Sequence, residues 1–109
     1  MNVTSINALA AEHLEKARTA ERGRSSITVY GRTGAHLRQT VSALDAGQVM
    51  GEHKSPGDAS VMCLQGRVVL RAGAVSVVLG PGDFTAVPPQ RHDLEALESS
   101  VVLLTVALH

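Results

Sequence analysis

The chain has 109 residues with ten basic and ten acidic side chains, and only Tyr30 and Phe84 are aromatic. This length suits one domain, whose core must be aliphatic. A net charge of zero and so few aromatic side chains argue against nucleic-acid binding, because phosphate contacts need basic residues and base stacking needs aromatic ones. We expect no nucleic-acid partner.

The sequence contains no apolar run near the roughly 18 residues that cross a membrane. Its first residues, Met1 to Thr4, lack the basic region and apolar stretch of a signal peptide. The single cysteine, Cys63, cannot form a disulfide within the chain. We therefore expect a cytoplasmic protein with no membrane partner.

The first twenty residues favour a helix. Ser5 suits an N-cap, and the residues that follow, up to Ala20, are rich in Ala, Leu, Glu, Lys and Arg. Glu12 stands four residues before Lys16, the favourable order for a helical ion pair. We predict a helical extension over residues 1–23 that lies on the body of the protein or on a second subunit. A frayed tail is the alternative.

From residue 24 onward the pattern becomes that of short strands separated by turns. The expected strands are Ile27 to Tyr30, Leu37 to Leu44, Gln48 to Glu52, Ser60 to Gln65, Arg67 to Ala72, Val75 to Leu79, Phe84 to Val87, His92 to Ala96 and Val101 to Ala107. No helix separates them, and each parallel crossover needs about a dozen residues or more. The sequence predicts an all-β domain over residues 24–109, an antiparallel sandwich or barrel.

Two of these strands are apolar on both faces, Arg67 to Leu70 and Val101 to Val106. One face of each strand can pack in the interior. The apolar side chains on the opposite face must then be buried by another part of the protein or by a second subunit. Because exposed apolar strands invite pairing between chains, we expect a homodimer. A covering N-terminal helix is the alternative explanation.

Two of the five histidines are candidates for a site, whereas His13, His36 and His109 are expected at the surface. His92 begins an alternating strand whose apolar side includes Leu94, so its imidazole is predicted to point inward. A buried imidazole needs a partner, because an unpaired polar group costs about 1–3 kcal/mol.

The second candidate, His53, ends a strand just before a Ser-Pro-Gly turn. If two neighbouring strands each point one histidine into the barrel, His53 and His92 can contribute to the same binding site. The alternative is that both histidines have only a structural role.

Two stretches of the chain resemble the motifs of the small single-domain cupins. They are Gly47, His53, Ser55 to Asp58 and Gly66, followed by Gly80 to Asp83, Pro88, Pro89 and His92. With Leu37 to Thr40 as lead-in, the resemblance covers residues 37–108, about two-thirds of the chain. It implies a double-stranded β-helix, a jelly-roll barrel whose open end holds the site.

The resemblance also implies a metal site of three histidines and one glutamate. His53 and His92 match two of these positions, but Ser55 stands at the second histidine and Ala59 at the glutamate. We therefore expect no cofactor. The alternative is a divalent Fe, Mn, Ni or Zn ion held by His53, His92 and Asp58, a two-histidine, one-carboxylate set that requires a backbone bulge.

Three other patterns resemble functional motifs, but we interpret each of them as structural. Ser55, His53 and Asp58 crowd a single turn with no visible oxyanion hole, which disfavours a hydrolytic triad. Cys63 reads as a small core residue rather than as a nucleophile. Residues 80–83 form a turn rather than a phosphate loop, because no helix follows them.

The expected function is binding of a small molecule in the aliphatic barrel, with His53 and His92 as polar anchors. The expected lining residues are Val61, Cys63, Phe84 and Leu94. A metal-dependent oxygenase or isomerase that uses the two histidines and a carboxylate is one alternative. A structural homodimer with a filled barrel is another. The sequence leaves open the ligand and whether any reaction is catalysed.

Overall fold

The computed structural model describes residues 1–54 and 57–107, with the backbone alone described at His53. Ser55 and His109 lie outside the described residues. The elements are α1 (Ile6–Thr19), β1 (Arg24–Tyr30), β2 (Leu37–Leu44), β3 (Val49–His53), β4 (Ala59–Gln65), β5 (Val68–Ala72), β6 (Val75–Leu79), β7 (Phe84–Ala86), β8 (His92–Ala96) and β9 (Ser100–Ala107). No helix within these ranges is long and apolar enough to cross a membrane.

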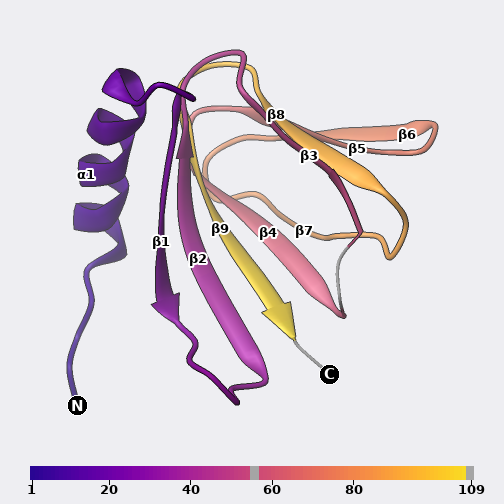
Figure 1. Ribbon diagram of the computed structural model, residues 1–109. Helices are drawn as coiled ribbons and strands as arrows, with labels where there is room; N and C mark the ends of the chain where they lie inside the picture. The colour runs from indigo at the N-terminus through magenta and orange to yellow at the C-terminus, as the bar shows by residue number, and fades with distance from the viewer. Residues whose placement is uncertain (55–56, 108–109) are drawn as a thin grey trace.

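The strands form two antiparallel sheets that face each other (Figure 1). One sheet has the order β1-β2-β9-β4-β7, and the other has the order β3-β8-β5-β6. Strands that are distant in sequence are neighbours in both sheets, as in β2 beside β9 and β3 beside β8. The prediction of an all-β jelly roll with a short N-terminal helix is confirmed.

The helix forms where the sequence indicates. The hydroxyl of Ser5 accepts a hydrogen bond from the amide of Ala8 at 3.1 Å, which satisfies one of the unpaired amides of the first turn. Lys16 Nζ lies 2.9 Å from Glu12 Oε2. The helix ends at Thr19, one residue before the predicted end.

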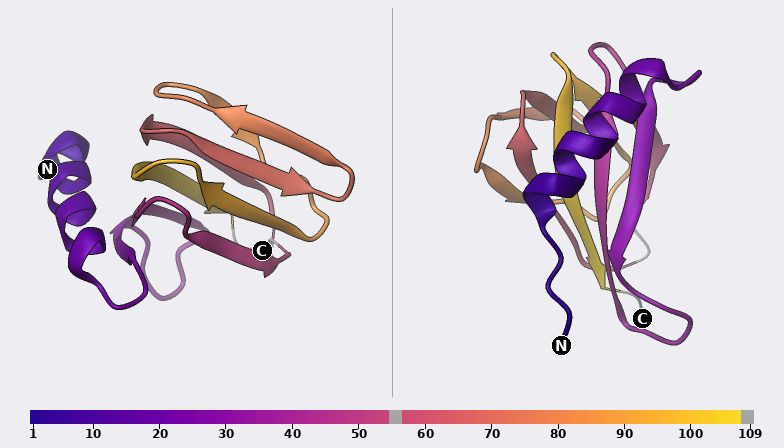
Figure 2. Two further views of the ribbon diagram at one scale, coloured as in Figure 1. Left: turned by 90° about the horizontal axis from the view of Figure 1, so that it is seen from above. Right: turned by 90° about the vertical axis from the view of Figure 1, so that its left-hand side faces the viewer.

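The helix covers the outer face of the five-stranded sheet (Figure 2). Its alanines allow it to approach closely, and the buried cluster beneath it contains Ala10, Ala17, Val41, Ala43 and Val101. The outer apolar face of β9 is therefore covered by a helix of the same chain, the alternative that the sequence left open. Homodimer formation stays a prediction.

The main core lies between the two sheets. Successive residues of β9 point to opposite faces: Val101 and Leu103 pack with the helix, while Val102 and Leu104 pack inward. The buried members of the core are Leu44, Val61, Cys63, Val68, Leu70, Leu79, Leu94, Ala96 and Val102. The core is aliphatic, as expected from the composition.

Candidate functional site

The two candidate histidines lie opposite each other on adjacent strands. The register of β3 with β8 pairs His53 with His92, and β5 places Ala72 on the other side of His92. The pairing of β3 with β8 shifts between Gly51 and His53. Because the side chain of His53 lies outside the described part of the chain, its role as an anchor or ligand stays a prediction.

The side chain of His92 is buried, with 7% of its surface exposed. Its Nδ1 lies 3.0 Å from the backbone oxygen of Gln90. A carbonyl oxygen can only accept, so Nδ1 carries a proton and donates it to Gln90. The contact also fixes the orientation of the imidazole, which points inward as predicted.

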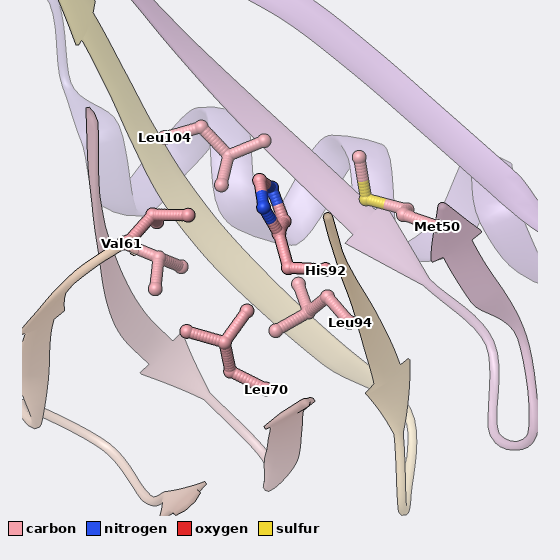
Figure 3. Close-up of a pocket in the computed structure, with 7 residues that line it drawn as sticks. Met50, Val61, Leu70, His92, Leu94 and Leu104 are labelled. Carbon is pink, nitrogen blue, oxygen red and sulfur yellow. The ribbon is translucent and has the colours of Figure 1, made fainter. Parts of the chain in front are cut away.

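A small apolar cavity lies beside this imidazole, between the two sheets (Figure 3). Its lining residues are Met50, Val61, Leu70, Val87, His92, Leu94 and Leu104. Its volume is about 40 Å³. Drug-sized ligands occupy pockets of roughly 300–1,000 Å³, so this cavity admits only a small group unless side chains move. Val61 and Leu94 are among its lining residues, and contact of either with a ligand stays a prediction.

Two of the expected lining residues are placed elsewhere. The expectation for Phe84 is wrong: its side chain is 62% exposed, because the register pairs Phe84 with Met62 on the outer face and turns Thr85 inward beside Val61. Cys63 belongs to the core but does not line the cavity.

Cys63 has the environment of an inert core thiol. Its side chain is fully buried, and Sγ lies 3.3 Å from the backbone oxygen of Gln65. Burial raises the pKa of the Cys63 thiol, and the nearby carboxylate of Asp83 adds to the effect. Because the thiolate is the nucleophilic form, this environment argues against covalent chemistry at Cys63.

A larger, charged depression lies next to the apolar cavity and shares His92 with it. Its volume is about 380 Å³, and its lining residues are Glu52, Arg71, Gly73, Gln90, Arg91, His92 and Asp93. Arg91 lies 3.3 Å from the carboxylate of Glu52, and Arg71 lies 3.2 Å from that of Asp93. These ion pairs give the depression charges of both signs.

Nothing in the local sequence pattern marks Arg71 or Arg91 as a site residue. Alternation along β5 places Arg71 on the face opposite Leu70, but its carboxylate partners lie on β8. Hydrogen bonds from the guanidinium to Glu95, and secondarily to Asp93, raise the pKa of Arg71 above its ordinary value. The register of β5 with β8 is what places Arg71 beside Asp93 and Glu95, and this register cannot be seen in the sequence of either strand alone.

The described residues do not fit a metal ion. Ala59, at the position of the expected glutamate, carries no donor atom, and Asp58 is exposed. Asp58 lines a separate depression of about 190 Å³ together with Leu37, Ala59, Ser60, Thr105 and Ala107. Within residues 1–54 and 57–107, the His53 side chain apart, no three His, Cys, Asp or Glu side chains could hold an ion. A set that includes His53 stays a prediction.

No protein-family model and no curated protein matches the chain. Among solved structures, the fold is similar to a conserved protein of unknown function from Streptococcus pyogenes, with 32% identity and a TM-score of 0.74. That match covers 83% of this chain and 78% of the other.

Two further solved structures share the fold at lower identity. A cupin superfamily protein from Desulfitobacterium hafniense has 18% identity and a TM-score of 0.75, and the match covers 84% of this chain and 83% of the other. A protein with a cupin-2 domain from Shewanella frigidimarina has 11% identity and a TM-score of 0.71, covering 96% of this chain and 94% of the other.

Proposed function

The chain is a small cupin-fold protein, and on that premise we propose that it binds a small organic molecule against His92 at the open end of its barrel. The observation that carries this proposal is the position of the imidazole. His92 borders both the apolar cavity inside the barrel and the charged depression outside it. Among the residues that line the apolar cavity, His92 is the one with a polar side chain, so its imidazole is the group that a polar atom of a bound molecule would contact.

The two spaces differ in size and in chemistry. The apolar cavity accepts a methyl or short alkyl group, since its volume is about 40 Å³. The charged depression, about 380 Å³, is larger, and its ion-paired side chains suit a polar group instead. Met50 stands at the cavity wall, and its flexible, unbranched side chain can change rotamer to enlarge the space.

No step of this proposal uses a metal, because the described residues do not fit one. The metal-dependent alternative has a direct check, the metal content of protein purified without chelators. We expect well under one equivalent of Fe, Mn, Ni or Zn. A stoichiometric metal that is lost in a His92→Ala variant would overturn the metal-free proposal.

The binding proposal is tested with three probes that share a short alkyl chain: butanol, butyrate and butylamine. We expect at least one of them to cause a saturable NMR shift of the Met50 methyl signal, because Met50 lines the cavity. The His92→Phe variant should lose the shift. His36→Phe is the matched control, since His36 is exposed and lines no cavity described above. A filled, purely structural barrel predicts no saturable shift with any probe.

A further inference from the structure

Strand β6 is an edge strand without the features that usually protect sheet edges. Among the described strands, β1 and β7 are the edges of the five-stranded sheet, and β3 and β6 are the edges of the four-stranded sheet. The outer side of an edge strand presents backbone N–H and C=O groups that can pair with another chain. Proteins usually block this pairing with charges, bulges or short strands.

The other three edges each carry such a feature. Strand β1 contains Arg24 and shifts register between Thr28 and Tyr30. Strand β3 contains Glu52 and also shifts register. Strand β7 has only three residues. Each of these edges is therefore a poor template for a further strand.

Strand β6 has none of these features. Its five residues, Val75–Leu79, include no charge, glycine or proline, and all five pair with β5 in one continuous register. Its three valines are all partly exposed to solvent: Val75 is 64% exposed, Val77 is 40% exposed and Val78 is 50% exposed. A regular, uncharged, apolar edge of this kind is the arrangement that favours strand addition.

We propose that β6 pairs antiparallel with β6 of a second copy, so that two four-stranded sheets join across a two-fold axis. With the axis at Val77, the middle residue, Val75 faces Leu79 of the second copy and Ser76 faces Val78. A two-fold axis brings a strand against itself, so any charge on it would meet its own sign. The absence of charge from β6 therefore fits a second copy of this chain as the partner.

The first test is sedimentation equilibrium of the full chain at high micromolar concentration. We expect twice the chain mass of 11.4 kDa for the native protein. Val78→Lys should give a monomer, because it places a cation on each side of the two-fold axis. Val49→Lys is the matched control. Val49 lies on the opposite edge strand of the same sheet, aligned with Val78 across the strands between them, and is 45% exposed. The Val49→Lys variant should remain a dimer.

A second variant covers the outcome in which Val78→Lys fails to fold, as judged by circular dichroism. Val77→Cys places a thiol at the proposed axis, where mild oxidation should join two copies rapidly. The native Cys63 is fully buried and should contribute no cross-link. Val49→Cys is the control and should cross-link slowly.

A monomeric native protein would overturn the proposal. So would a folded Val78→Lys variant that keeps the dimer mass, or cross-linking of Val77→Cys that is no faster than that of Val49→Cys.

Discussion

His13 of helix α1 and Ser25 of strand β1 connect the helix to the sheet, with His13 Nδ1 2.7 Å from Ser25 Oγ. The imidazole is 5% exposed, so the expectation that His13 is solvated is wrong. The reason is its position between Ala10 and Ala17 on the buried face of the helix. Among the described atoms, Nε2 has no hydrogen-bond partner, although Glu12 Oε2 lies 3.7 Å away.

The first prediction concerns this contact. His13→Ala should lower the free energy of unfolding by about 2 kcal/mol, because it removes both a buried hydrogen bond and packing atoms. His13→Leu should cost less, since it retains volume and eliminates the buried Nε2. Urea unfolding measures both effects. The exposed His36→Leu variant should change stability little.

A double-mutant cycle isolates the hydrogen bond from the packing. Ser25→Ala should cost about 1 kcal/mol in the native background and close to nothing in the His13→Leu background. Equal costs in the two backgrounds would show that the contact contributes nothing to stability.

The second prediction concerns Ser100, whose buried hydroxyl joins β9 to the start of β5. Its Oγ accepts a hydrogen bond from the amide of Arg67 at 3.0 Å and lies 2.6 Å from the backbone oxygen of Glu98. Ser100→Ala should reduce the free energy of unfolding by about 1–3 kcal/mol, because it deprives the Arg67 amide of its partner. Thermal and urea unfolding both measure the change.

The control for Ser100 is Thr33→Ala, which removes an exposed hydroxyl from a loop between β1 and β2. Gly66→Ala should be more damaging than either. Gly66 has a φ of +79°, and a Cβ there would collide with Ser100 Oγ and the backbone oxygen of Ser99. A Gly66→Ala variant as stable as the native chain would contradict this packing.

The third prediction concerns the start of the helix. Ser5→Ala should destabilise the protein by about 1 kcal/mol, because the amide of Ala8 loses its acceptor. Ser5→Asp should restore most of the loss, since a carboxylate caps the same amide and interacts well with the helix N-terminus. If alanine and aspartate have the same effect in urea unfolding, the cap is not formed in solution.

Most of the fold was predictable from local patterns. Alternating apolar residues and intervening turns located every strand, with limits that differ by a few residues. Strand β1 begins at Arg24 rather than Ile27, because its ladder with β2 extends to the pair Arg24 and Leu44. That extension depends on a partner distant in sequence, so alternation within β1 could not reveal it.

The candidate site was less predictable, because it depends on register between strands. The alternation of apolar and polar residues along β8 correctly predicted that the side chain of His92 points inward. Phe84 is predicted to line the barrel, whereas its register with Met62 turns its side chain outward. The ion pair between Arg71 and Asp93 needs the alignment of β5 with β8, which a single sequence does not contain.

The fourth prediction concerns Cys63 at alkaline pH. Burial raises the pKa of this thiol above its ordinary value of about 9.0, so the unfolded chain loses its thiol proton at a lower pH than the folded chain. Well below pH 9.0 the thiol is protonated in the folded and in the unfolded chain, so its ionisation costs no stability there. As the pH rises above 9.0, ionisation favours the unfolded state, and the free energy of unfolding should fall.

Two measurements separate this effect from other alkaline titrations. Urea unfolding of the native chain and of Cys63→Ala, followed from pH 8 to pH 10.5, should show a steeper fall for the native chain, because only it carries the thiol. At pH 8 a thiol reagent should modify Cys63 only as fast as the protein opens, since the sulfur is fully buried. Rapid modification of the folded protein, or parallel pH profiles for the two chains, would mean that water reaches this part of the core.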